Sequence, residues 1–357
     1  MKKAMSKHIP LVATLVLGLA AIFVLPAFVE AFTLMELMVY VIMSILALSL
    51  GFVWGYGGIL CFGQSAFFGL GAYTYAIAAI NFGESTAAVG LAIAVPALFA
   101  LALGYFTFFG RISDVYFGVI TLTVTLILFN LVNSTAGEQY RIGSAPLGGF
   151  NGIPSIPTLN IPGMPDRVLD PQSLFIVCVI LLMLVYLGLR WLLSSHFGRV
   201  VVAIRENEKR ADLLGYDSRK YKLVTFAIGG GIAGLAGCLF ANWGAFTSPT
   251  VFSLAQSAQV IIWIIVGGYG TLLGPVVGCF LVQWLTSYAG TLSAINPSLL
   301  LGAVLIAFVL LLPRGLVPLL QTAFVRWYPR LLSIKRQPDK AEARDALDRI
   351  PLAGTEP

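Results

Sequence analysis

Long apolar stretches with few or no charged residues follow one another from the N-terminus to about Pro313. A helix needs about 20 mainly apolar residues to cross the hydrocarbon core of a bilayer, and stretches of that length recur throughout this part of the chain. Only 11% of the 357 residues are charged, whereas an ordinary soluble domain has roughly 25%. The sequence therefore predicts an all-α, polytopic membrane protein whose single transmembrane domain covers residues 1–318.

The positions of the charged residues predict about ten membrane-spanning helices. The eighth expected span is short, and Gly267, Gly268 and Gly270 lie at its end, so it is either a full span or a broken, re-entrant helix. The first apolar run is longer than the roughly 7–15 apolar residues of a secretory signal, which favours a retained helix. In chain order, the expected spans are 9–30, 33–55, 65–82, 86–109, 115–133, 172–194, 222–243, 255–269, 273–290 and 298–317.

The distribution of Lys and Arg predicts how these spans are oriented, because positively charged loops stay on the cytoplasmic side. With ten spans, both termini and the loop 195–221 lie on the face that carries most of the basic residues. The net charge of +6 is then explained by this inner face and by contact with membrane lipid, and not by nucleic-acid binding. Residues 319–357 are expected to form a polar cytoplasmic tail that is partly disordered.

The segment 134–171 is expected on the opposite, periplasmic side. It is rich in glycine and proline, which excludes a long helix. We expect it to pack over the outer mouth of the bundle, where Arg141 and Arg167 are candidates for contacts with an acidic partner. An ordered cap without any partner is equally compatible with the sequence.

The sequence lacks the motifs of an enzyme or an ATPase. It contains no G-x-x-x-x-G-K-[ST] loop for binding ATP, and neither H-E-x-x-H nor G-x-S-x-G occurs. The two histidines, His8 and His196, are far apart, and the four cysteines include no C-x-x-C pair, so we expect no metal site and no catalytic residue. Because the cysteines lie in or beside apolar spans, they are expected to be buried and reduced.

The expected spans hold almost no ionisable side chain in their interiors, and Glu36 is the main exception. An ion-coupled carrier usually keeps carboxylates near the middle of the membrane, because the coupling ion needs a charged partner there. The sequence therefore disfavours an ion-coupled carrier or channel, and a membrane enzyme with a polar catalytic cluster as well. Uphill transport by this chain would need energy from a partner protein.

The loop 195–221 contains a short helix of the kind on which a partner protein docks. Asn207 is expected to cap this helix at its start, and Gly215 supplies the left-handed residue that ends it. Ala211 and Leu214 are expected to share one face. A solvated amphipathic connector would show the same pattern. The candidate docking residues are Arg205, Glu206, Asn207, Glu208, Ala211, Leu214 and Gly215.

Polar side chains within the expected spans are candidates for lining a translocation pathway. Gly57 to Gly63 interrupt the helical pattern, and backbone groups freed at membrane depth are tolerated only beside protein or water. Close packing of helices at small residues, and hydrogen bonds between helices, are alternative explanations for these glycines and polar residues. Thr121, Thr123 and Thr125 alternate along one helix and cannot all face one pore. The candidate lining residues are Gln64, Ser65, Tyr73, Thr74, Gln256 and Gln259.

Several of these segments together resemble one known family. The stretch Ala203-Ile204-Arg205-Glu206-Asn207-Glu208, followed by Ala211 and Leu214-Gly215, is similar to the coupling-helix signature of LivM-type permeases in the branched-chain amino acid ABC importer family. The similar segments extend over roughly residues 50–317. The others are Gly55–Leu60, Gly63–Tyr73, Ala233–Gly237, Gly267–Pro275 and Leu312–Leu316.

The resemblance implies a type II ABC importer-like permease, with broken or re-entrant helices, in a bacterial inner membrane. Such a chain translocates branched-chain amino acids into the cytoplasm and forms half of the pathway, while a LivH-type permease forms the other half. Two ABC ATPase subunits bind ATP and magnesium, so this chain is not an enzyme and holds no cofactor, and a periplasmic solute-binding protein delivers the solute. The segment Glu206–Gly215 would be the coupling helix. Relatives in the family carry urea, short amides or aromatic acids, and these solutes remain alternatives.

Overall fold

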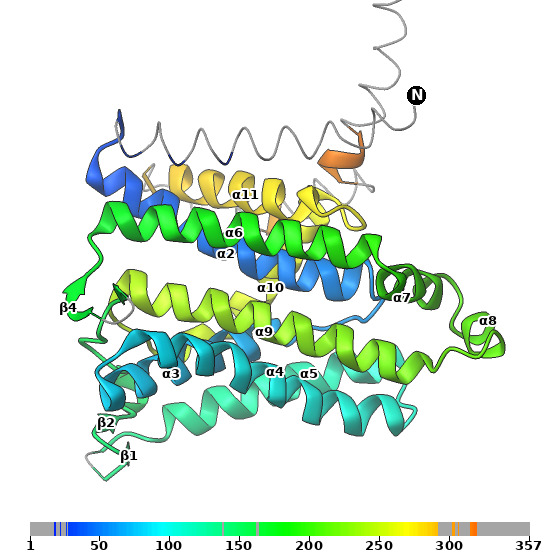
Figure 1. Cartoon of the computed structure of the whole chain (residues 1–357), viewed down its shortest axis with the longest axis horizontal. Coiled ribbons are helices and arrows are strands. Elements are labelled where there is room, and N and C mark those ends of the chain that lie inside the picture. The colour runs from blue at the N-terminus through cyan, green and yellow to red at the C-terminus, as the bar shows by residue number, and fades with distance from the viewer. Residues whose placement is uncertain are drawn as a thin grey trace, which may run out of the picture.

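The computed structural model describes residues 28–137, 139–161 and 164–291, together with positions 18, 22, 26, 302, 303, 306 and 315–319. Within these residues, six helices are long and apolar enough to cross a membrane. Figure 1 shows them side by side in one bundle, which confirms the predicted all-α, polytopic fold. They are α2 (Ala31–Gly55), α3 (Gln64–Phe82), α4 (Ser85–Phe109), α5 (Asp114–Asn133), α6 (Pro171–Ser194) and α9 (Ser218–Gly244).

Shorter elements complete the bundle, and one of them is an incomplete span. Helix α10 has 14 residues and so extends about 21 Å, which is less than the roughly 30 Å of the hydrocarbon core. It ends at Gly268, whose φ is 108°. The structure therefore favours the broken helix over the full span. The other helical elements after α6 are α7 (His196–Glu206), α8 (Glu208–Leu213), η2 (Pro249–Phe252), α10 (Leu254–Gly267) and α11 (Leu273–Thr291).

The expected spans between residues 33 and 290 agree with these helices to within about two residues, except at the start of α9. This helix begins at Ser218 instead of residue 222, because its first turn is polar and continues the helix beyond the apolar run. The expected spans 9–30 and 298–317 lie largely outside the described residues. The tail beyond residue 319 lies outside them as well.

Helices α2, α3 and α9 form the centre of the bundle, whereas α4, α5 and α6 expose most of their side chains at its periphery. Glycines allow the central helices to approach each other closely. A Cβ on Gly71 of α3 would collide with the backbone of Gly234 in α9, and one on Gly237 would collide with the backbone of Phe68. Pro96 of α4 packs against the same Gly234. These contacts are the close helix packing that the sequence offered as one explanation of its glycines.

The four cysteines lie inside this bundle. Cys61, Cys178, Cys238 and Cys279 are all buried and free of disulfides, as the sequence predicted. Their exposed fractions are 1% for Cys61 and 0% for the other three. They are packing residues of the apolar core.

The segment 134–171 folds into short strands and a single 3-10 turn, η1 (Gly149–Asn151), in its described part. It is tied to the bundle by a backbone bridge between Ile153 and Thr247 and by the Tyr75 hydroxyl, which donates to the Pro157 carbonyl at 2.9 Å. Figure 1 shows the strands at the opposite end of the bundle from α7 and α8. The antiparallel pairs are β1 (Arg141–Ile142) with β2 (Ala145–Pro146), and β3 (Asn160–Ile161) with β4 (Met164–Val168).

Candidate functional site

The predicted docking segment, residues 205–215, contains the end of α7 and the whole of α8, at one end of the bundle. Asn207 leaves helical geometry (φ −160°, ψ 99°), and its side chain accepts a hydrogen bond from the Arg210 amide at 2.9 Å, so it caps α8 as expected. Gly215 has φ 89°, the left-handed conformation predicted for it. The expected coupling helix Glu206–Gly215 is nevertheless too long. Glu206 is the last residue of α7, and α8 covers only Glu208–Leu213.

The exposed face of α8 also differs from the prediction. Ala211 is buried, whereas Leu214 is 73% exposed, so the two residues do not share a face. The reason is that the chain leaves the helix at Leu214 (φ −82°, ψ 2°), where helical spacing no longer applies. Leu213 is 88% exposed. Two adjacent leucines are therefore exposed at the end of α8. In the sequence, an apolar pair inside a strongly charged loop is the pattern that could have indicated this exposed surface.

The inner face of this segment packs into a small apolar cluster of its own. Ala211 contacts Val200 and Ile204 of α7, and Tyr216 and Tyr221 pack against them. This cluster is separate from the main core of the bundle. Because Tyr221 belongs to α9, this cluster joins α7 and α8 to the start of that helix, and further contacts join the segment to the rest of the bundle.

Arg205 provides one such contact. Its Nη1 donates a hydrogen bond to the carbonyl of Gly55, the last residue of α2. A cation is favoured at a helix C-terminus, where the unpaired carbonyls concentrate negative charge. Gly58 has φ 68°, and a Cβ placed there would lie 2.9 Å from Arg205 Cγ, so only glycine leaves room for this side chain. Arg205 thereby ties the docking segment to the interruption between α2 and α3.

The glycine-rich segment that follows α10, residues 267–270, lies beside Arg205 and close to the interruption between α2 and α3. A Cβ on Gly270 would lie 4.0 Å from Arg205 Nη1, and the rings of Trp54 and Tyr269 stack with centroids 6.1 Å apart. The two segments and Arg205 were separate candidates in the sequence, and the fold brings them together.

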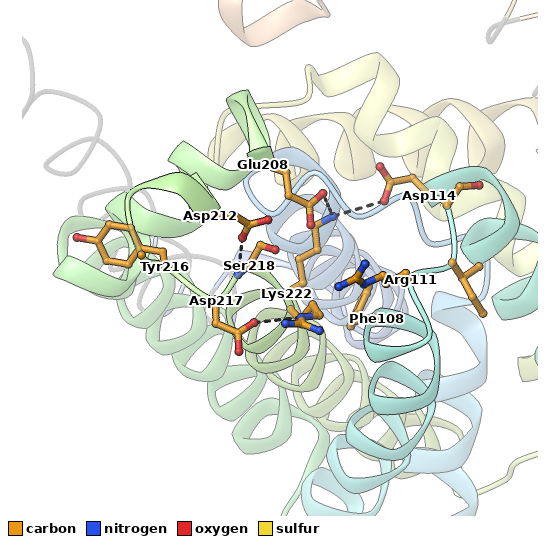
Figure 2. Close-up of a pocket in the computed structure, with 13 residues that line it drawn as sticks. Phe108, Arg111, Asp114, Glu208, Asp212, Tyr216, Asp217, Ser218 and Lys222 are labelled. Atoms are coloured by element: carbon orange, nitrogen blue, oxygen red, sulfur yellow. Dashed lines mark hydrogen bonds and ion pairs between the residues drawn. The ribbon is translucent and has the colours of Figure 1, made fainter. Parts of the chain in front are cut away.

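A charged cleft of about 800 Å³ lies behind α8, between the turn from α4 to α5 and the start of α9 (Figure 2). Lys222 stands in this cleft with only 12% of its side chain exposed. Its Nζ lies 2.7 Å from Glu208 Oε2 and 3.7 Å from Asp114 Oδ1. The charged residues that line the cleft are Arg111, Asp114, Glu208, Asp212, Asp217, Arg219 and Lys222.

The other carboxylates of the cleft have different partners. Burial of the Asp217 carboxyl, which would raise its pKa, is outweighed by the hydrogen bond from Lys220 and the charge of Arg219, and the pKa lies below its usual range. Asp212 Oδ1 accepts a hydrogen bond from the Ser218 amide at 3.3 Å. The sequence pattern could not show this network, because Asp114 and Lys222 are more than a hundred residues apart in the chain.

The six candidate pathway residues fall into two groups. Gln64 Nε2 donates to Ser49 Oγ at 2.8 Å, and the Ser65 hydroxyl bonds that of Ser257, so both side chains join helices. Tyr73 is buried against the ring of Phe252. The remaining three, Thr74, Gln256 and Gln259, are half-buried.

Two further polar features agree with the sequence. Thr121 and Thr125 are buried while Thr123 is exposed, so the three threonines do not face the same side. Glu36 accepts hydrogen bonds from Tyr40, at 2.8 Å, and from Ser287. This carboxylate therefore belongs to a local network between α2 and α11.

A bundle of apolar spans with a capped polar segment at one end is the architecture of a multi-pass transmembrane protein. The model of a family described as "branched-chain amino acid transport system / permease component" matches residues 32–309, and the chain belongs to this family.

Curated relatives agree with the family match. The high-affinity branched-chain amino acid transport system permease protein LivM of Escherichia coli K12 is 29% identical over 309 residues, which cover 79% of this chain and 68% of the relative. The probable branched-chain amino acid transport permease protein LivM of Methanocaldococcus jannaschii is 27% identical, over 67% and 76%. The autoinducer 2 import system permease protein LsrC of Yersinia pseudotuberculosis is 29% identical, over 56% and 55%. No solved structure matches the chain.

Proposed function

We propose that this chain is the LivM-type permease subunit of an ABC importer that carries branched-chain amino acids into the cytoplasm across a bacterial inner membrane. Its partners are a LivH-type permease, two ATPase subunits that bind ATP and magnesium, and a periplasmic solute-binding protein. The observation that carries this proposal is the capped helix α8 with Leu213 and Leu214 exposed at the end of the bundle. Exposed apolar side chains on a rigid helix suit docking into a groove of another protein.

The docking segment can transmit movement because it is held to the bundle. Arg205 contacts the end of α2, and the Asn207 side chain caps the start of α8 directly after α7. A push on α8 by closing ATPases would then move the segment as a rigid body. In this proposal Ala211, which is buried, supports α8 from the inside. The residues proposed to meet the ATPase are Arg205, Glu206, Asn207, Glu208, Leu214 and Gly215, together with the exposed Leu213.

The solute pathway is proposed along α3 and α10. Thr74, Gln256 and Gln259 are half-buried and would be reached first by a solute. Gln64, Ser65 and Tyr73 are enclosed between helices and would contact it only when those helices separate. These polar but uncharged side chains suit a neutral or zwitterionic solute, whose recognition is left to the binding protein.

Reconstitution of the complete importer tests the proposal. Proteoliposomes containing this chain, the second permease and the ATPases, with the binding protein outside, are expected to accumulate leucine, isoleucine or valine only when ATP is supplied. Uptake of urea, short amides and aromatic acids is measured in the same proteoliposomes. If only one of these is taken up when ATP is supplied, that compound is the solute in place of the branched-chain amino acids. Accumulation against a gradient by this chain without the ATPases would overturn the proposal.

The orientation of the chain gives a separate prediction. Phe150 is 66% exposed in the segment 134–171, so Phe150→Cys is expected to react with an impermeant thiol reagent added to intact spheroplasts. Leu213→Cys, at the opposite end of the bundle, is the matched control and should react only after lysis. The native cysteines are buried and give little background. The reverse pattern of labelling would show that the proposed cytoplasmic location of the termini is wrong.

A further inference from the structure

We propose that Lys222 is a positioning residue that joins the short helix α8 to the N-terminus of α5, so that a push on α8 also moves α5. The inference rests on the proposed function, because it takes α8 as the element that receives the movement of the ATPases. It adds a specific path by which this movement enters the bundle.

The geometry of Lys222 carries the proposal. The residue lies in the second turn of α9, and Figure 2 shows its ammonium group between Glu208 of α8 and Asp114, the first residue of α5. The distances from Nζ are 2.7 Å to Glu208 and 3.7 Å to Asp114. Asp114 also stands where the N-terminus of α5 favours a negative charge. One cation therefore bridges two carboxylates that belong to different helices.

The burial of Lys222 distinguishes this bridge from ordinary surface ion pairs. Its side chain is 12% exposed, whereas Lys220, which pairs with Asp217 in the first turn of the same helix, is 71% exposed. Exposed pairs contribute little, because solvent and salt screen them. A lysine whose side chain is mostly buried would be left poorly compensated if it lost one carboxylate, so the three groups are held together more strongly.

Three phenylalanine rings next to the cleft show how α4, α5 and α9 are packed without Lys222. Phe226, one turn further along α9, contacts Phe117 of α5 and Phe108 of α4, with ring centroids 5.1 Å and 6.0 Å apart. Helices α4, α5 and α9 are therefore already packed as one unit at this end. Helix α8 has its apolar contacts in the separate cluster around Ala211. Tyr221 of α9 also packs in that cluster, and the pair of Glu208 with Lys222 adds a charged connection between α8 and the packed unit.

The other two carboxylates of the cleft, Asp212 and Asp217, have partners of their own, so Glu208 and Asp114 are the ones that pair with Lys222. Arg219 lies 3.4 Å from Asp217, and Asp212 accepts a hydrogen bond from the Ser218 amide. Both carboxylates are thus engaged at the start of α9 itself. They do not compete for the ammonium of Lys222.

The test measures how much solute the complete importer moves for each ATP hydrolysed. Lys222→Met keeps the apolar stem but removes the charge, and the solute moved per ATP is expected to fall about tenfold, within the usual range of coupling between sites. Binding of the ATPases and ATP hydrolysis itself should persist, since Leu213 and Leu214 are untouched. Lys220→Met is the matched control and should keep the ratio of the unaltered complex. An unchanged ratio in Lys222→Met would overturn the inference.

A conservative variant separates positioning from simple stability. Lys222→Arg keeps a cation beside Glu208 and Asp114, and it is expected to retain most of the ratio that Lys222→Met loses. If Lys222→Met does not accumulate in the membrane, Asp114→Asn decides the question, because Asp114 is 61% exposed and its loss leaves the fold intact. A normal ratio in Asp114→Asn overturns the bridge. Absence of ATP-driven uptake in the unaltered complex would instead count against the proposed function.

Discussion

The double variant Leu213→Glu/Leu214→Glu is expected to insert normally and yet to lose ATP-driven uptake. Both side chains are exposed at the tip of the docking segment, so charging them costs the fold of this chain little. In the proposed complex they are buried in a groove of the ATPase, where each leucine contributes roughly 2 kcal/mol. With about 1.4 kcal/mol for each tenfold change, the loss of both leucines should weaken ATPase binding by about a thousandfold.

Co-purification of the ATPases with the tagged permease measures this effect directly. The control is Leu213→Met/Leu214→Met, which keeps two flexible apolar side chains at the same positions and should retain both the complex and the uptake. Full recovery of the ATPases with the glutamate variant would show that the exposed leucines are not the docking surface.

Gly71→Leu is expected to prevent the chain from accumulating as a folded protein. Even a Cβ at this position meets the backbone of Gly234, so a leucine forces α3 and α9 apart at the centre of the bundle. Overpacking of this kind costs at least about 3 kcal/mol, the upper end of its usual range. The amount of monodisperse protein extracted from membranes, and its melting temperature in detergent, report the loss.

Gly90→Leu provides the comparison for the same substitution. Gly90 lies on α4, and a Cβ there meets nothing within 4 Å. A leucine at this exposed position should leave extraction and melting temperature unchanged. Equal behaviour of the two variants, with both folded, would mean that α3 and α9 do not approach as closely as described.

The helices could be predicted well from the sequence, because the length of each apolar run largely determines where a membrane-spanning helix forms. An apolar run of sufficient length must form a helix in lipid, and charges or glycines mark its ends. The start of α9 was wrong for the same reason: Ser218, Arg219 and Lys220 are helical without being apolar. The short length of α10 was only one of two alternatives, since glycines after a helix fit either a turn or an interruption.

The docking segment could be located in the sequence, but its surface could not be derived from helical spacing. The cap at Asn207 and the left-handed Gly215 are local signals, and both were predicted. The exposure of Leu213 depends on where the helix ends and on which side Ala211 is buried, and these are consequences of tertiary packing. The contact of Arg205 with Gly55, like that of Lys222 with Asp114, joins residues far apart in the chain and has no signature in a single sequence.

The separate apolar cluster beneath α8 has a practical consequence. Because it contains few residues, α7 and α8 can open locally while the transmembrane core stays folded. A preparation can therefore be homogeneous and thermally stable while the proposed docking segment is locally open, since this segment contributes little to those measurements. For the proposed importer, the number of solute molecules moved per nucleotide consumed is a better criterion of quality than the yield of intact bundle.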